Sequence, residues 1–337
     1  MSLKVTVIIP HRVGENIENT LAGIYMSDYD KNNIEIFQAE GTHPTVQRNE
    51  CIKQASGDIV YFIDNDSMIN PNNIKKAVEI FETNENVAIV GGPAIHNVNS
   101  SKEKYIDKCM RSYYAVGPIA NRYSVNKTSS REGTDRDVIL CNLFIRLNVL
   151  FEAGLFNESL YPNEENALID KILSLGYKLM YDPQIIVKRP PRSSLRLYIK
   201  MLLNYGRGRF EQLYRDFNKK NLIFTLPAFF SLYIIFLPIV LFIFLITKIV
   251  FLALYFIPFG LYFAVTLLAG IITSLKEAGF INKIKGFFVF PYMFFITHFF
   301  YGLGFFYGII RIAKGFTHAG RRQRTVKFNI KKFKSFE

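Results

Sequence analysis

The feature that most constrains the fold of this chain is the run from Asn221 to Leu275, in which Lys248 is the only charged residue. A helix that crosses a bilayer needs about 20 predominantly apolar residues. Three segments of the chain satisfy this requirement: about 222–247, 249–273 and 286–310. A large helical core in a soluble protein is the alternative, but so long a run without charge is unusual in soluble domains. We therefore expect a transmembrane region of two to three hydrophobic segments over residues 221–313.

The charged residues are distributed unevenly around these apolar segments. Residues 1–182 carry a net charge of −6, residues 183–220 one of +8 and residues 221–337 one of +11, which together give the +13 of the whole chain. Basic residues beside long apolar runs are typical of a membrane surface, where they meet anionic headgroups. We therefore expect a membrane partner and no nucleic acid. The three Cys residues form no closely spaced pair, which argues against a disulfide scaffold or a structural zinc site.

The sequence also bears on how the chain is oriented in the membrane. The apolar run within Met1–Pro10 is too short for a secretory signal, so we expect the front half in the cytosol. The tail over 314–337 is strongly basic, and the positive-inside rule places it in the cytosol as well. Two cytosolic ends require an even number of crossings. We therefore expect a multi-pass protein of the cell membrane in which segment 286–310, broken by Pro291 and several Gly, is re-entrant or interfacial.

Ahead of the apolar region, residues 4–182 alternate between strand-like and helix-like runs, which is typical of an α/β domain with a mostly parallel sheet. The expected strands are Val5–Pro10, Asn33–Gln38, Asp58–Ile63 and Val87–Val90, and the expected helices are Glu15–Tyr25, Thr45–Ala55 and Pro71–Thr83. The predicted organisation is an α/β domain over 1–185, a basic connector or interfacial helix over 186–220, the apolar region over 221–313 and a basic tail over 314–337.

Two carboxylates stand at the end of the third expected strand. Asp64 and Asp66 follow the hydrophobic run Ile59–Ile63 directly. In an open α/β sheet, ligands bind beyond the carboxyl ends of the strands. Oxygen ligands at this place suit Mg²⁺ or Mn²⁺, whose coordination shell is usually completed by substrate phosphates. The alternative is a turn that is acidic without binding a ligand.

A second pair of carboxylates, Glu164 and Glu165, opens a predicted helix in the segment Tyr161–Leu173. Acidic residues are favoured at a helix N-terminus by the helix dipole, so this capping role is one interpretation. The other is a general base that faces the metal site and removes a proton from an attacking hydroxyl.

The connector is rich in Arg, first in Lys188–Arg192 and again in Tyr205–Arg209. Arg beside Gly suits a phosphate group, because a planar donor fork is combined with a backbone that can approach closely. An amphipathic helix that faces lipid headgroups explains the same pattern. Both interpretations stay open.

These features, in this order, resemble the family 2 glycosyltransferases of the GT-A fold, a Rossmann-like nucleotide-diphospho-sugar transferase domain, over about residues 3–215. The segments that carry the resemblance are Val5–Pro10 for the first strand, Gly57–Asp66 for the strand and its DxD motif, Leu140–Arg146 with Glu152–Glu158 for the acceptor-side segment, and Asn163–Asn166 for the ED motif. The chain departs from the family at His11-Arg12-Val13, where Thr/Ser-Tyr-Asn is usual, and at the ED pair, which is Glu-Glu.

The resemblance implies roles for individual residues. It implies that Asp64 and Asp66 hold Mn²⁺ or Mg²⁺ against the donor diphosphate, and that Glu165, with Glu164 beside it, is the catalytic base. The residues that it places at the nucleotide-sugar donor are Pro10, His11, Arg12, Glu15, Glu40, Arg48, Asp64, Asn65, Asn142, Arg207 and Arg209. Of these, Arg207 or Arg209 would meet the leaving diphosphate from the connector.

Together these features predict an inverting, metal-dependent glycosyltransferase. It would move a sugar from a nucleotide-sugar donor, with a UDP-sugar favoured over a GDP-sugar, to a lipid-linked acceptor during synthesis of a surface polysaccharide or glycan. Two alternatives stay open. One is a polyprenyl-phosphate sugar synthase, whose acceptor is itself a phosphate, and the other is a non-catalytic membrane partner that binds a nucleotide-sugar.

Overall fold

The computed structural model describes residues 2–125, 129–315 and 329–333, and the chain divides into two compact units. The first unit comprises Met1–Asn97, Pro118–Pro191 and Thr317–Glu337, and the second comprises Val98–Gly117 and Arg192–Phe316. The second unit therefore draws on a short insertion in the front half as well as on the apolar region.

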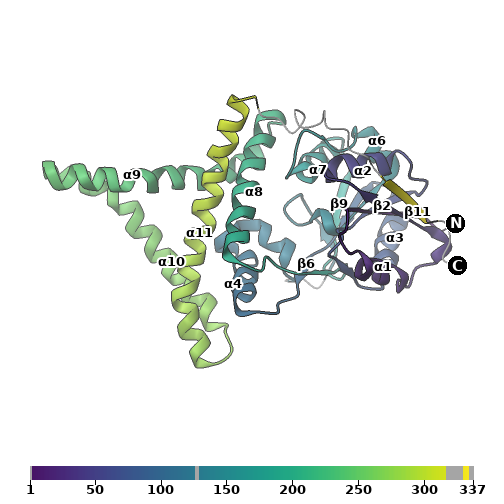
Figure 1. The fold of residues 1–337 in the computed structure, drawn as a ribbon, viewed down its shortest axis with the longest axis horizontal. Helices are drawn as coiled ribbons and strands as arrows, with labels where there is room; N and C mark the ends of the chain where they lie inside the picture. The colour runs from purple at the N-terminus through teal and green to yellow at the C-terminus, as the bar shows by residue number, and fades with distance from the viewer. Residues whose placement is uncertain (1, 126–128, 316–328, 334–337) are drawn as a thin grey trace. The chain divides into compact units, whose positions relative to one another are not determined.

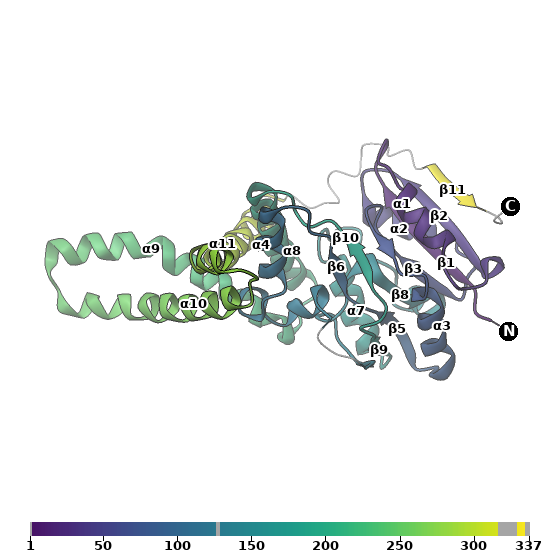
Figure 2. The same cartoon turned by 90° about the horizontal axis from the view of Figure 1, so that it is seen from below.

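The first unit is built on an eight-stranded mixed sheet with the strand order β11-β2-β1-β3-β8-β5-β9-β7 (Figures 1 and 2). Its strands are β1 (Val5–His11), β2 (Ile34–Glu40), β3 (Ile59–Phe62), β5 (Val87–Gly91), β7 (Arg131–Glu132), β8 (Leu143–Arg146), β9 (Lys178–Tyr181) and β11 (Asn329–Phe333). The pairs β1/β2, β1/β3 and β5/β9 are parallel, and the other neighbours are antiparallel. A smaller sheet has the order β4 (Met68–Ile69), β10 (Val187–Arg189), β6 (Ala94–His96).

Helices pack on both faces of the large sheet. Ile8 of β1 packs with residues of α2 (Pro44–Ile52), α6 (Leu147–Glu152) and α7 (Glu164–Ser174) in one apolar cluster. Val7 and Ile9, on the opposite face, pack with residues of α1 (Glu18–Tyr25) and α3 (Asn73–Thr83) in another. Successive side chains of a strand point to opposite faces, so a strand that is buried on both sides is apolar throughout. The expected α/β domain is thus confirmed, but the expectation of a mostly parallel sheet is wrong, because β8, β7 and β11 join the large sheet antiparallel to their neighbours.

The expected elements differ from the observed ones mainly at their ends. α1 begins at Glu18 rather than Glu15, because residues before it form a turn in which the Arg12 N–H donates to Glu15 Oε2 at 3.0 Å. α2 ends at Ile52 rather than Ala55, and α3 begins at Asn73 rather than Pro71. Three short 3₁₀ turns complete the unit: η1 (Lys31–Asn33), η2 (Gly117–Tyr123) and η3 (Leu140–Asn142).

The second unit is helical. Its elements are α4 (Ser101–Met110), α5 (Tyr113–Val116), α8 (Leu195–Arg215), η4 (Lys219–Thr225), α9 (Leu226–Thr247), η5 (Val250–Phe256), α10 (Ile257–Leu275) and α11 (Phe280–Ala313). Glycines let α8 and α11 approach closely: a Cβ on Gly206 would lie 1.9 Å from the Tyr301 carbonyl oxygen, and one on Gly304 would lie 2.3 Å from that of Leu203. Figure 1 shows α9 and α10 as the two arms of a V, with α11 running between their open ends.

Three helical segments are long and apolar enough to cross a membrane: Lys219–Thr247, Val250–Leu275 and Phe280–Ala313. They coincide with the three apolar segments predicted from the sequence. The most apolar window is only 6% buried in each of the first two but 39% buried in the third. Of the predicted basic tail, Arg321, Arg322, Arg324 and Lys334 lie outside the described residues, and Lys331 and Lys332 belong to strand β11.

Candidate active site

The two carboxylates expected at the end of the third strand lie there. All four residues of β3 are buried, whereas the side chains of Asp64 and Asp66 are 27% and 36% exposed. The hydroxyl of Thr20, from α1, lies 2.9 Å from the carbonyl oxygen of Asn65 and 2.8 Å from that of Ser67. This contact fixes the loop that presents both aspartates at the carboxyl edge of the sheet.

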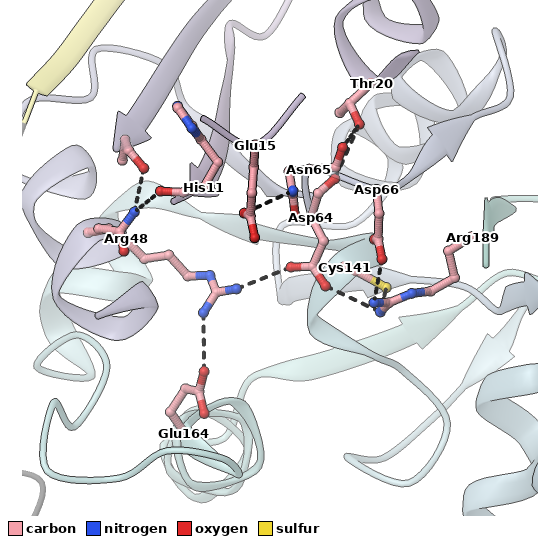
Figure 3. Close-up of polar contacts among 12 residues, drawn as sticks. His11, Glu15, Thr20, Arg48, Asp64, Asn65, Asp66, Cys141, Glu164 and Arg189 are labelled. Atoms are coloured by element: carbon pink, nitrogen blue, oxygen red, sulfur yellow. Dashed lines mark hydrogen bonds and ion pairs between the residues drawn. The ribbon is translucent and has the colours of Figure 1, made fainter. Parts of the chain in front are cut away.

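A guanidinium group bridges the two aspartates (Figure 3). Arg189 Nη1 lies 3.2 Å from Asp64 Oδ2, and Arg189 Nη2 lies 3.2 Å from Asp66 Oδ2. Arg189 is the last residue of β10, which places it beside the end of β3, although it lies 123 positions after Asp66 in the sequence. Sequence reasoning noted Arg189 only as part of the basic run 188–192. The local feature that could have singled it out is its position at the end of a short β-like run, directly before two prolines.

A second arginine joins the aspartates to the start of α7. Arg48 Nη2 lies 3.3 Å from Asp64 Oδ1, and Arg48 Nη1 donates to Glu164 Oε1 at 3.1 Å (Figure 3). Both Arg48 and Glu164 are buried. The resemblance implied a contact between Arg48 and the nucleoside; the structure shows its side chain held between two carboxylates.

The two glutamates of α7 lie in different surroundings. Burial raises the pKa of the Glu164 carboxyl to about 8, with a smaller rise from the charge of Glu165 and an opposing effect of Arg48. Glu164 Oε2 has no hydrogen-bond partner. Glu165 Oε1 lies 3.7 Å from Arg122 Nη1, and Arg122 also donates to the side chain of Asn166. Arg122 lies in η2 and was missed, because its place in the sequence carries no motif.

The burial of Glu164 predicts a pH-dependent stability. Its pKa in the folded protein lies above the ordinary value near 4.5, so the folded chain holds a proton that the unfolded chain releases, and stability falls as pH rises from about 4.5 to about 8. Glu164→Gln keeps the neutral form. We therefore expect the difference in Tm between Glu164→Gln and the wild type to rise between about pH 5 and pH 9, measured by thermal denaturation in detergent.

The control for this measurement is Glu132→Gln, which replaces an exposed carboxylate of the same unit. Its Tm should follow that of the wild type at every pH. If the Glu164→Gln curve also runs parallel to the wild type, the carboxyl of Glu164 is already charged near neutral pH, and the assignment of a neutral Glu164 is wrong.

The residues expected at the ends of the first two strands lie at this same edge of the sheet. Pro10 and His11 end β1, and Glu40, which ends β2, is the ladder partner of His11. Glu15 Oε2 accepts from the Arg12 N–H at 3.0 Å and from Asn65 Nδ2 at 3.1 Å. The turn after β1 is therefore tied to the loop that carries the aspartates (Figure 3).

Asn142 differs from its expected role. It is fully buried, its Oδ1 accepts from the Tyr61 hydroxyl at 3.2 Å, and its Nδ2 donates to the carbonyl oxygens of Ile185 and Pro93 at 2.7 and 3.2 Å. A side chain with no exposed surface and both ends engaged supports the loop around residue 185. It does not offer a group to a donor.

The last two residues expected at the donor, Arg207 and Arg209, belong to α8 of the second unit. Arg207 Nε lies 3.7 Å from Glu211 Oε1, and Arg209 Nη1 donates to Gln212 Oε1 at 3.0 Å. Both arginines are buried within the second unit.

The mixed α/β sheet, with acidic and basic side chains gathered at the carboxyl ends of its strands, agrees with the GT-A fold expected from the sequence. Residues 18–150, less than half of the chain, match the family model described as glycosyl transferase family 2. The match includes Arg48, Asp64 and Asp66 and ends before Glu164. No curated protein matches the chain.

Several solved structures are similar to this chain at low sequence identity. The mannosyltransferase PcManGT from Pyrobaculum calidifontis, in complex with GDP-Man and Mn²⁺, is 16% identical with a TM-score of 0.47, over 64% of this chain and just under two thirds (65%) of that one. S. aureus TarS 1–349 in complex with UDP is 16% identical with a TM-score of 0.42, over 65% and 68% of the two chains. TarS 1–349 alone aligns over 93% and 92%, at 13% identity and a TM-score of 0.44.

Proposed function

We propose that this protein is an inverting, divalent-cation-dependent enzyme that moves a sugar from a nucleotide-sugar donor to a lipid-linked acceptor at a membrane. The observation that carries the proposal is the cluster of Asp64 and Asp66 with Arg189 and Arg48, which sits at the carboxyl edge of a family 2 domain and reaches the acidic start of α7. The apolar helices of the same chain support an acceptor that is held in a membrane.

Asp64 and Asp66 fit a divalent cation. Both carboxylates contact one guanidinium, so the space between them already accommodates a positive charge. Mg²⁺ and Mn²⁺ are commonly held by one or two carboxylates together with substrate phosphates. Within the described ranges no group of three or more His, Cys, Asp or Glu is placed to hold a metal. When bound, the cation would neutralise charge on the leaving diphosphate.

In the proposed displacement, the bond from the sugar to the donor diphosphate breaks as the bond to the acceptor oxygen forms, and the acceptor hydroxyl loses its proton. Glu165 is the group proposed to accept this proton, because Glu164 is protonated at neutral pH by burial. Arg122 orients Glu165. Arg189 and Arg48 supply positive charge at the aspartates, which favours the diphosphate as it leaves.

The experiment that tests the proposal is a thermal-shift panel on the full chain in detergent, with UDP, GDP, CDP and dTDP, each with Mn²⁺ or with EDTA. A ligand that binds the folded state raises the Tm by mass action. We expect one nucleotide to raise the Tm with Mn²⁺ and to lose its effect with EDTA. A panel without any shift would favour a protein that does not use nucleotide-sugars.

Mass spectrometry of the lipid product then distinguishes the two candidate reactions. A new glycosidic bond indicates transfer to a lipid-linked saccharide, and a sugar–phosphate–lipid bond indicates a polyprenyl-phosphate sugar synthase.

The proposal includes a cytosolic front unit and two crossings, by α9 and α10. The connection between α10 and α11 carries Glu277, a buried residue that pairs with Lys104 and Lys108 of α4. α4 begins only four residues after Asn97 of the first unit, and four residues cannot span a hydrocarbon layer of about 30 Å. The short connection before α4 supports the proposal that the start of α11 lies on the cytosolic face of the membrane.

The end of α11 supports the same topology. Strand β11, which follows α11, pairs with β2 in the sheet of the first unit, with Asn329 opposite Glu40. This pairing supports the proposal that both ends of α11 lie on the cytosolic side of the membrane. Tyr105 of α4, Tyr114 of α5 and Tyr198 of α8 contact its apolar face, through Phe290, Phe294 and Thr297 respectively. We propose that α11 is an interfacial helix.

Cysteine labelling of intact cells tests this topology. A membrane-impermeant maleimide is expected to label Ile249→Cys, between the two crossing helices, and to label Lys276→Cys and Lys314→Cys only after permeabilisation. The native thiols give little background, because Cys51, Cys109 and Cys141 are buried and burial raises the pKa of each. Labelling of Lys314→Cys from outside intact cells would show that α11 crosses the membrane.

A further inference from the structure

Most of the carboxylate oxygens at the end of β3 are already paired with arginines (Figure 3). Arg189 lies 3.2 Å from Asp64 Oδ2 through its Nη1 and 3.2 Å from Asp66 Oδ2 through its Nη2. The second oxygen of Asp64, Oδ1, lies 3.3 Å from Arg48 Nη2. A divalent cation ligated by both aspartates would compete with Arg189 for their oxygens and would be repelled by its charge. Arg189 and such a cation therefore exclude each other at this pair.

The two arginines are held differently, and Arg189 is the one that can withdraw. The side chain of Arg48 is 6% exposed, and its Nη1 donates to Glu164 Oε1 at 3.1 Å, so it keeps a partner on α7. The side chain of Arg189 is 17% exposed. Arg189 ends the three-residue strand β10, and Pro190 and Pro191 follow it. Because proline has no N–H to donate, the strand ladder does not continue beyond Arg189.

The charge of Arg189 is balanced at this place by the two aspartates. Cys141 Sγ also lies 3.4 Å from Arg189 Nη1, but burial raises the pKa of this thiol to about 12, so it stays neutral and adds no counter-charge. When the aspartates take up a cation, the guanidinium needs another anion. A diphosphate is such an anion, because the donor fork of arginine matches phosphate oxygens as well as it matches a carboxylate.

We propose that Arg189 is a built-in competitor of the divalent cation. It pairs with Asp64 and Asp66 until a cation and a nucleotide diphosphate are bound together, and it then transfers its charge from the aspartates to the diphosphate. This inference rests on the function proposed above, which supplies the cation and the nucleotide. Its consequence is cooperative binding. A cation alone must displace a guanidinium that has no new anion to bind, whereas with the nucleotide the same guanidinium gains one, so each ligand raises the affinity for the other by the same factor.

The test measures Mn²⁺ bound to the full chain in detergent by equilibrium dialysis, without nucleotide and then with UDP, GDP, CDP or dTDP. Binding that remains in Asp66→Ala is subtracted as background. Without nucleotide, Arg189→Gln is expected to bind Mn²⁺ at least about tenfold more tightly than the wild type, because the competing charge is gone. With the correct nucleotide this difference should shrink or reverse, because only the wild type gains the contact between Arg189 and the diphosphate.

Two further variants separate the pairing of Arg189 from its charge. Arg192→Gln removes an exposed arginine three residues later, and it should bind Mn²⁺ as the wild type does. Arg189→Lys keeps the positive charge, but its single ammonium cannot form the two-pronged contact with both aspartates. Its affinity for Mn²⁺ should lie between those of the wild type and Arg189→Gln.

The outcomes distinguish failure of this inference from failure of the proposed function. Equal Mn²⁺ affinities of the wild type and Arg189→Gln, with the folding of the variant checked by its Tm, overturn the competition. An equal gain in Arg192→Gln overturns it as well, because any lost charge would then have the same effect. If Arg189→Gln does not fold, an unchanged affinity in Arg189→Lys overturns it instead. A wild type that binds Mn²⁺ but none of the four nucleotides refutes the proposed function, whereas the competition for Mn²⁺ alone is still measured.

Discussion

Glu165→Gln is expected to lower kcat by about 10²–10⁴-fold, because the amide cannot accept the proton of the attacking hydroxyl. The affinity for the donor should stay within about twofold of the wild type, because the proposed function places the donor at the aspartates and not at α7. Transfer is measured as nucleotide diphosphate released in the presence of acceptor lipid. Donor affinity is measured by thermal shift with Mn²⁺. This split between turnover and binding identifies a base.

Two controls sharpen this result. Glu164→Gln is a neutral change at the adjacent position, and it should reduce kcat much less, because the carboxyl it replaces is already protonated. Arg122→Gln removes the side chain that orients Glu165, so it should lower kcat and also change the pH profile of the reaction. Near-normal turnover in Glu165→Gln would move the base elsewhere, with Glu164 as the first residue to examine.

Asp66→Ala is expected to abolish the Mn²⁺-dependent rise in Tm that the correct nucleotide produces. It should also lower turnover by at least about 10³-fold, because the cation and the leaving diphosphate would lose a shared anchor. The loss of Asp66 also frees one side of the Arg189 guanidinium. A nucleotide shift that persists in EDTA would show that Arg189 alone can hold the diphosphate. Asp28→Ala, which removes an exposed carboxylate from the same unit, is the matched control and should leave the shift intact.

The parts of this structure that were predictable from the sequence are those with a local signal. An apolar run of more than fifty residues with a single charge, Lys248, is typical of membrane helices, and α9 and α10 are found where the hydropathy places them. A β-branched run such as Val5–Ile9 predicts a strand whichever neighbours it pairs with. Asp64 and Asp66 were found for the same reason, because the polar edge of a sheet begins where an apolar strand stops.

The parts that were not predictable depend on distant segments meeting in space. Nothing in the local sequence distinguishes Arg189, which bridges the aspartates, from Arg192, three residues later. Arg122 reaches Glu165 from a turn without any motif. Asn142 showed the opposite error: an asparagine in a family-like segment was expected at the donor, but three buried hydrogen bonds hold it in the core.

The pairing of β11 with β2 has a consequence for how the protein is made. Glu40 and Asn329 are neighbours in the sheet but about 290 residues apart in the chain, and closing so long a loop costs entropy that grows with the logarithm of its length. During translation β2 leaves the ribosome before the apolar helices α9, α10 and α11, and β11 leaves it after them. The edge of the sheet at β2 therefore stays without its β11 neighbour until all of the apolar helices have been synthesised.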